Sequence, residues 1–146
     1  MILSLQDLLS DNQAITATAV STNSLDLGAT GTIYGTSAAI VRDIGKGEPE
    51  VDLLVQATET FTAAGAATLT VTLQTDDNSA FSSATDVLVL GPFPKATLVA
   101  GWKLPVQYMP DGINERYFRL NYTVATGPMT AGKLTAGITM GRQTNG

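Results

Sequence analysis

Residues 116–140, RYFRLNYTVATGPMTAGKLTAGITM, contain two segments in which apolar and polar side chains alternate, joined by a Gly-Pro turn. In the first segment every second residue from Phe118 to Val124 is apolar, and in the second every second residue from Leu134 to Met140 is apolar. A period of two places alternate side chains on opposite faces of an extended chain. Each segment therefore predicts a β-strand with one buried face.

The same alternation recurs along the chain. ATLTVTLQT, residues 67–75, places Leu69, Val71 and Leu73 on one face. Other strand candidates lie at residues 14–20, 50–58, 86–91 and 96–106. Turn signals rich in Gly, Pro, Asp and Asn lie at residues 63–67, 75–80, 91–94, 110–112 and 125–132. Seven or eight short strands without a long helical period predict an all-β single domain over residues 1–146, a jelly-roll antiparallel β-sandwich. Only LQDLLSD, residues 5–11, predicts a helical turn or two.

One segment interrupts this regular spacing. Residues 27–49, LGATGTIYGTSAAIVRDIGKGEP, carry five glycines and are longer than most connections in a compact domain. The pieces Thr-Ile-Tyr and Ala-Ile-Val predict an inserted hairpin or long loop near residues 28–41 that projects from the sandwich.

Composition excludes several classes of function. The chain has no cysteine and no histidine, which removes disulfides, thiolate nucleophiles, imidazole acid-base groups and the usual zinc ligands. The net charge is −5 and the eight Lys and Arg residues are scattered, so no nucleic-acid partner is expected. We read no signal peptide and no apolar run of about 20 residues, and expect no membrane partner.

Two groups of acidic residues could in principle carry chemistry. Asp76, Asp77, Asn78 and Asp86 offer clustered oxygens, but their spacing departs from the EF-hand pattern, which favours a β-turn capped by its own side chains over a calcium site. A second group could supply a glycosidase-like carboxylate pair, yet a row of acids on one strand face is usually a solvated face. It comprises Glu48, Glu50, Asp52 and Glu59. No serine nucleophile motif is present either, so we expect no enzyme, no metal and no cofactor.

Four long segments resemble a known family. They are LLSDNQAITATAVSTNSLDLG, RDIGKGEP, FTAAGAATLTVTLQTDDNSAFSSATD and ERYFRLNYTVATGPMTAGKLTAGITMGRQ, covering residues 8–28, 42–49, 61–86 and 115–143. In this order they are similar to the capsid cement, or decoration, proteins of tailed double-stranded-DNA bacteriophages, of the type found in short-tailed phages that infect Bordetella. The sequence departs from that pattern at residues 28–41, where typical members pass almost directly from DLG to RDIG.

The resemblance implies a jelly-roll protein on the outer surface of the virion capsid, made in the host cytoplasm. Such a protein contacts major capsid protein subunits of neighbouring capsomers, reinforces the expanded head and performs no catalysis. We expect a homodimer, with a trimer as the alternative. A rival interpretation is a carbohydrate-binding β-sandwich on a virion or cell surface, which would present exposed aromatic rings.

Contacts with the capsid or with other copies are expected in the N-terminal arm, in the insertion and in two loops. Trp102 shares a predicted strand face with Leu104 and Val106, which favours the core, while its ring makes an interface the alternative. Arg116 and Arg119 could bind acidic partner residues, or Arg119 could simply occupy a solvated face. The candidate contact residues are Met1, Ile2, Leu3, Leu5, Ile33, Tyr34, Ile40, Arg42, Trp102, Tyr108, Met109, Arg116, Arg119 and Met129.

Overall fold

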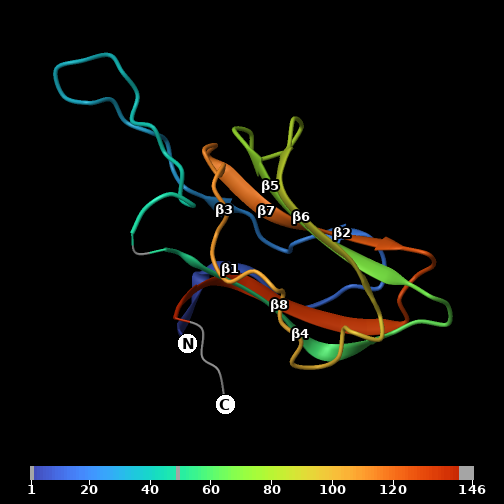
Figure 1. Ribbon diagram of the computed structural model, residues 1–146. Helices are drawn as coiled ribbons and strands as arrows, with labels where there is room; N and C mark the ends of the chain where they lie inside the picture. Colours follow the sequence, from blue (N-terminus) through green and yellow to red (C-terminus); the bar gives the residue numbers. More distant parts are fainter. Residues whose placement is uncertain (1, 49, 142–146) are drawn as a thin grey trace.

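The computed structural model describes residues 2–48 and 50–141, with Ile2 described only by its backbone. Within these residues the protein is all-β: eight strands form two antiparallel sheets and no helix is present, which confirms the predicted β-sandwich (Figure 1). No helix of the described residues is therefore long and apolar enough to cross a membrane. The strands are β1 (Ile2–Ala14), β2 (Ala19–Val20), β3 (Leu25–Asp26), β4 (Asp52–Thr62), β5 (Thr68–Asp76), β6 (Thr85–Pro94), β7 (Tyr117–Ala125) and β8 (Ala131–Met140).

The strand order is that of a jelly roll. One sheet has the order β1-β8-β4, and the other has the order β2-β7-β5-β6, with the short β3 also paired to β7. Residues 98–109 run antiparallel along the free edge of β4. Their backbone hydrogen bonds reach β4 and the residue before it. At one end Phe61 N donates to Leu98 O (2.9 Å), and at the other Met109 N donates to Val51 O (2.8 Å). With this edge segment as a fourth member of the first sheet, both sheets have the strand order of a double Greek key.

The edge segment corrects the prediction of a regular strand at residues 96–106. Gly101 has a φ of +91°, which turns the chain, and Pro105 has no N–H to donate to a ladder. Only single bridges form as a result, between Lys103 and Gln56 and between Tyr108 and Asp52.

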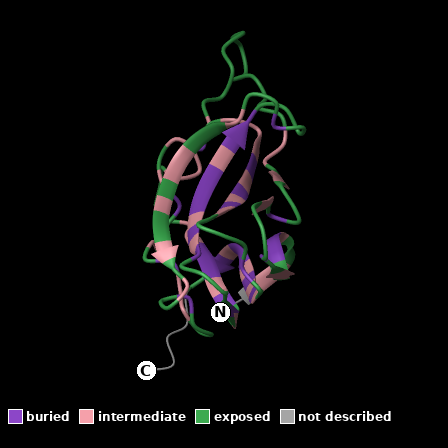
Figure 2. Cartoon of the chain, turned by 90° about the vertical axis from the view of Figure 1, so that its right-hand side faces the viewer, coloured by how far each residue is buried: buried purple, intermediate pink, exposed green. Residues whose placement is uncertain are grey.

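The core lies between the two sheets. Phe118, Leu120 and Tyr122 of β7 and Leu69 and Leu73 of β5 are all at most 1% exposed, which confirms the predicted inward faces of these two strands. Figure 2 shows buried positions along the inner strands, whereas the loop that projects from the sandwich is exposed. Because the two sheets bury one continuous apolar cluster, their loops and insertions extend from a closely packed scaffold.

The N-terminal region differs from its prediction. Residues 5–11 form no helical turn but belong to β1, and the predicted strand at residues 14–20 is divided by a bend at residues 16–18. Strand β1 pairs with β8 through three register shifts, and Asn12 has a positive φ of 49°. Pairing to a central strand satisfies a long row of backbone groups, and this outweighs the weak helical pattern of the segment. The expected turn at residues 91–94 is likewise part of β6.

The alternation of β8 also fails near its end. Met140 was expected on the inner face but is 78% exposed, while Gly137 on the other face is buried. Leu8 of β1 and Leu54 of β4 are both cross-strand partners of Gly137, so the three residues lie side by side on the outer face of this sheet. Both leucines are buried, which shows that this central strand is covered on both faces and cannot keep a simple polar-apolar alternation.

Candidate interaction surface

Residues 28–41, which we call the arm, extend away from the sandwich as a narrow hairpin (Figure 1). Thr32 and Ala39 form an antiparallel bridge, flanked by hydrogen bonds from Ile33 N to Ala38 O (3.1 Å) and from Ile40 N to Gly31 O (3.0 Å). All residues from 29 to 41 are exposed. The predicted projecting hairpin is therefore confirmed.

The exposed side chains of the arm are unusually apolar. Ile33 and Ile40 are 52% and 51% exposed, Val41 is 92% exposed, and Tyr34 is fully exposed. No residue of the arm is charged. Large apolar side chains gathered on one projecting segment are typical of a protein contact, whereas scattered single ones are ordinary surface residues.

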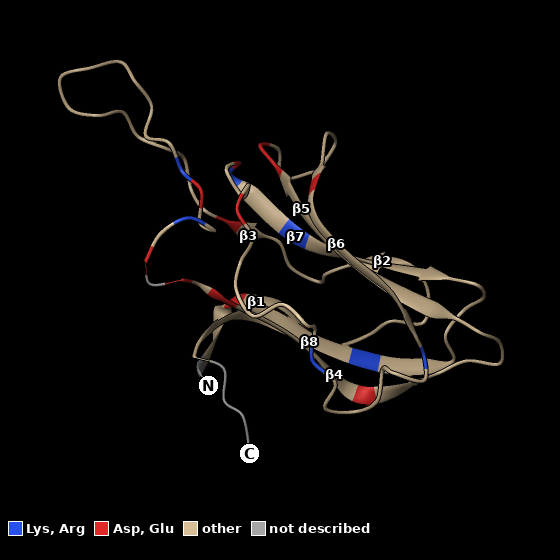
Figure 3. Ribbon diagram, in the orientation of Figure 1, with Lys and Arg blue, Asp and Glu red and all other residues tan. Residues whose placement is uncertain are grey.

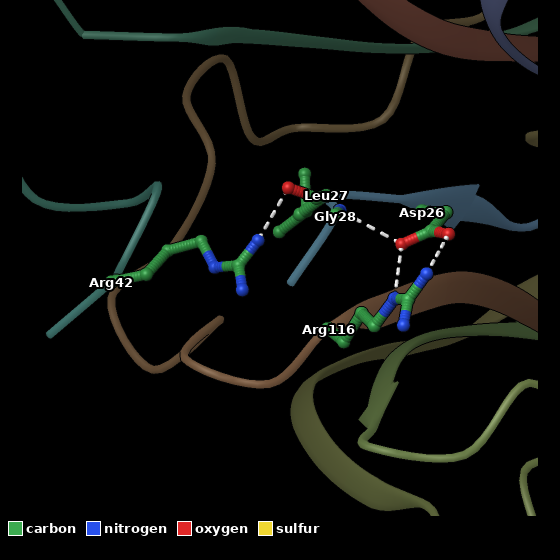
Figure 4. Close-up of polar contacts among 5 residues, drawn as sticks. All are labelled: Asp26, Leu27, Gly28, Arg42 and Arg116. Atoms are coloured by element: carbon green, nitrogen blue, oxygen red, sulfur yellow. Dashed lines mark hydrogen bonds and ion pairs between the residues drawn. The ribbon is translucent and has the colours of Figure 1, made fainter. Parts of the chain in front are cut away.

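The base of the arm is held by a fork-like ion pair (Figure 4). Arg116 donates from Nε to Asp26 Oδ1 and from Nη2 to Asp26 Oδ2, and each of these hydrogen bonds is 2.7 Å long. The same Asp26 Oδ1 accepts the backbone N–H of Gly28 (2.8 Å), and Arg42 donates from Nη1 to the carbonyl of Leu27 (2.5 Å). Leu27, just before the arm, and Arg42, just after it, are thus bound to each other, and Asp26 is bound to Arg116 of the sandwich.

These contacts shift the ionisation of the groups involved. The hydrogen bond from Arg116, together with that from Gly28, lowers the pKa of Asp26 to about 2, and the carboxylate in turn raises the pKa of Arg116. For Asp43, desolvation would raise the pKa, but backbone hydrogen bonds from Gly112 (2.9 Å) and Gly45 (3.1 Å) outweigh it and lower the pKa. At neutral pH both carboxylates are charged and bound.

Charge is distributed unevenly around this region. Figure 3 shows blue and red residues gathered where the arm joins the sandwich and none along the arm itself. A shallow hollow of about 460 Å³ lies against the stem, lined by Ala29, Thr30, Gly31, Ile40, Val41, Arg42 and Asp43. A second, more polar hollow of about 460 Å³ at the base includes Glu115 and Arg42, whose Oε2 and Nε atoms are buried without a hydrogen-bond partner. The region therefore combines a polar base with a neutral tip.

The N-terminal candidate contacts lie in β1 or outside the described residues. Met1 lies outside the described residues, and nothing is described of the Ile2 side chain. Leu3 is half-buried and Leu5 is 81% exposed, and both belong to the edge strand β1. What was expected to be an N-terminal arm is therefore part of a sheet over its described length.

The methionine candidates Met109 and Met129 lie in the interior, whereas the aromatic candidates Trp102 and Tyr108 keep part of their surface exposed. Trp102 is half-buried and packs edge-on against Phe93, with ring centroids 5.0 Å apart, in agreement with the core interpretation. Met109 and Met129 are 4% and 2% exposed, so their side chains are not on the surface. Tyr108 is 42% exposed.

The arginine candidates all have partners within the chain. Arg116 and Arg42 hold the base of the arm. Arg119 lies over the ring of Phe81, with 4.2 Å from Cζ to the centroid, and donates from Nε to Gln74 Oε1 (3.0 Å). A partner that used these guanidinium groups would have to compete with contacts already made.

The acidic groups also serve the scaffold. Asp76 accepts the backbone N–H groups of Asn78 (2.9 Å) and Ser83 (2.8 Å), and these bonds lower its pKa although desolvation acts to raise it. Lys133 of β8 pairs with its cross-strand neighbour Glu59 of β4, with 2.9 Å between Nζ and Oε2 and both side chains partly exposed. The β-turn interpretation of residues 76–86 is supported, and the described residues contain no group of three or more acidic side chains able to hold a metal ion.

Sequence reasoning missed several exposed apolar residues. Val41 is the largest omission, although its position at the end of an uncharged Ala-Ile-Val run was a usable signal. Val20 and Val89 are 42% and 56% exposed on the outer face of the second sheet. Their exposure depends on which face of the edge strands β2 and β6 turns outward, which no local pattern indicated.

One comparison with known proteins gives a match. A protein-family model, Bbp16, matches residues 9–138. This range spans the arm, contains β2 to β7 in full and contains most of β8 and part of β1. No curated protein matches the chain.

Proposed function

The chain belongs to the Bbp16 family, whose name is of the Bordetella phage type and is consistent with a phage protein, and we propose that it is a structural protein of the phage particle. In this proposal it binds the outside of the icosahedral capsid and links neighbouring major capsid protein subunits, thereby stabilising the DNA-filled head. It acts by binding and not by catalysis, and copies associate as homodimers.

The observation that carries the proposal is the arm. A neutral hairpin with exposed Ile33, Tyr34, Ile40 and Val41 stands on a base held by the Asp26–Arg116 pair. An exposed apolar segment has an unfavourable free energy in water, and burying it against another protein removes that cost. Because the base is already held by these contacts, little conformational entropy is lost there when the arm binds.

Such a protein would stabilise the head by linkage. A protein that binds only the mature shell lowers the free energy of that state by its binding free energy, so disruption of the shell must also break these contacts. Many copies on a symmetric lattice, and oligomers that reach several subunits, add avidity to modest individual contacts. A compact scaffold with projecting segments suits this task, because the sandwich stays rigid while the projections reach neighbours.

The test is co-sedimentation of the purified protein with phage heads that lack it, before and after expansion, followed by heating to compare DNA release. The proposal expects saturable binding to expanded heads and DNA release at a higher temperature than from undecorated heads. A variant in which two glycines replace residues 29–40 is expected to bind more weakly while keeping the melting temperature of the sandwich.

Two outcomes would contradict the proposal. Absence of binding to both forms of the head would remove the capsid role and direct attention to a glycan array. Binding without any change in DNA release would leave a capsid-associated protein but remove the cementing role.

A further inference from the structure

The arm has two chemically different faces. Because Thr32 lies opposite Ala39, the pairs Ile33/Ala38 and Gly31/Ile40 share one face of the hairpin, by the alternation of side chains in a strand pair. The other face carries Thr30, Thr32, Ala39 and Val41. Ile33 and Ile40 are diagonal neighbours and are each about half exposed, whereas Val41 on the opposite face is 92% exposed.

A hairpin of this kind gains little stability from its own contacts. Isolated two-stranded ribbons are marginally stable in water, and this ribbon extends beyond the sandwich, where no other described element packs against it. Its two edges also carry backbone groups without partners in the hairpin, which can hydrogen-bond to a neighbouring strand.

We propose that the arm docks through its Ile33/Ala38/Ile40 face into an apolar, uncharged groove of a protein partner, which under the proposed function is a shell subunit of the capsid. The inference rests on that proposed function and specifies which surface of this chain makes the contact and what chemistry receives it. The 14-residue span 28–41 has no charge in a chain of net charge −5, so a charged groove would gain nothing from it and would lose its own hydration.

Other occupants fit these observations less well. A lipid bilayer is disfavoured because the open edges of a two-stranded ribbon would leave backbone groups unsatisfied in hydrocarbon. A second copy pairing arm to arm would bury only one small face on each side, well short of the roughly 1,200 Å² of a stable specific interface. A groove that encloses the ribbon buries both isoleucines and can also satisfy a ribbon edge.

The test compares two variants with matched chemistry. Ile33→Ser with Ile40→Ser removes the apolar face, and Val41→Ser makes the same kind of change at a more exposed residue of the opposite face. Neither site belongs to the core, so both variants are expected to melt at the wild-type temperature. We expect the double variant to bind expanded heads at least about 10-fold more weakly, and Val41→Ser to bind within about twofold of wild type.

Proteolysis gives an independent readout. Tyr34 is the only aromatic residue of the arm and is fully exposed, so chymotrypsin is expected to cut the free protein there. Binding to heads is expected to protect this bond, and protein cut at Tyr34 is expected to bind more weakly than intact protein. Persistent cleavage at Tyr34 on heads that carry the protein would overturn docking of the arm and leave capsid binding itself intact.

The remaining outcomes are also decisive. Equal binding by the wild type and the double variant, or an equal loss with Val41→Ser, overturns the assignment of the face. Loss of self-association by the double variant in sedimentation velocity, with head binding unchanged, makes a second copy the occupant. Flotation of the wild type, but not the double variant, with phosphatidylcholine vesicles makes lipid the occupant. Absence of head binding by the wild type removes the proposed function and this inference together.

Discussion

The phenolic oxygen of Tyr122 on β7 lies 2.8 Å from the hydroxyl oxygen of Ser10 on β1, a buried contact that joins the two sheets across the core. Ser10 uses its one hydrogen in a bond to Gln13 Oε1 (2.8 Å), so Tyr122 donates to Ser10. The same Gln13 oxygen accepts the backbone N–H of Thr22 (2.9 Å). A single tyrosine hydroxyl thus connects the interior to the polar network around the β1–β2 bend.

Replacing Tyr122 with phenylalanine is expected to lower the free energy of unfolding by about 0.5–1.5 kcal/mol, because the hydrogen bond between the sheets is lost while the ring still fills its site. Urea denaturation measures the change. Tyr34→Phe, which alters a fully exposed hydroxyl on the arm, serves as the control and is expected to leave the free energy unchanged. Equal effects of the two substitutions would show that the buried bond contributes nothing specific.

Alkaline pH is expected to destabilise the fold through the same residue. Burial raises the pKa of Tyr122 above the ordinary value of 10.0, and the hydrogen bond with Ser10 opposes this only in part. The neutral phenol is therefore favoured in the folded state, so this stabilisation is present below pH 10 and is lost as the pH rises further. Ultraviolet titration of the folded wild type should show a tyrosine that stays protonated above pH 10, and this late step should be missing from Tyr122→Phe. A late step of equal size in both proteins would contradict the expectation.

Acid pH is expected to loosen the base of the arm. The pKa of Asp26 is lowered to about 2 from 3.8, so its contribution to stability is present above pH 3.8 and is lost as the pH falls toward 2. The carboxyl resonance of Asp26 measured by NMR should titrate near pH 2 in the wild type. In Arg116→Lys, which keeps the charge but loses the two parallel bonds, the midpoint should move toward 3.8. An unchanged midpoint would show that Arg116 is not the main cause.

Gly137→Ala is expected to destabilise the protein by about 1–3 kcal/mol, because a Cβ there would lie 2.7 Å from the carbonyl oxygen of Asp7 and 3.1 Å from Leu8 Cα. Both are backbone atoms of β1, so relief requires moving a paired strand. Gly65→Ala is the matched control, since its Cβ would meet only Thr126 O at 3.7 Å. Thermal melts that fail to separate the two variants would show that β1 adapts to the added methyl group.

The second sheet was the most predictable part of the fold. In β7, and in β5 apart from the buried Thr72 and Asp76, one face meets the core and the other is partly exposed. Leu69 and Phe118 could therefore be assigned inward from alternation alone. The projecting hairpin was predictable for a different reason. A long, uncharged, glycine-rich span between two recognisable segments has no place in a compact sandwich.

The first sheet was less predictable because its central strand is covered on both faces. Burial of Gly137 between Leu8 and Leu54 depends on how β1 crosses β8, a long-range arrangement with no signal in either segment alone. The edge segment at residues 98–109 likewise pairs with β4 through scattered backbone bonds that leave no periodic pattern.

The candidate site was predictable in place but not in detail. Ile33, Tyr34 and Ile40 were identified because they lie in the Thr-Ile-Tyr and Ala-Ile-Val pieces of the expected projecting hairpin. The role of Arg116 as the partner of Asp26, 90 residues earlier in the chain, required the fold, because only the pairing of β3 with β7 brings them together.

The hydrogen bond from Arg42 to the carbonyl of Leu27 holds the two ends of the arm together. The sandwich therefore keeps the same geometry at these two residues whatever sequence connects them. The free energy of closing a loop depends only weakly on loop length when its ends are already held together. Residues 29–40 therefore form a natural exchange point, where a foreign peptide or an affinity tag could be grafted without refitting the core.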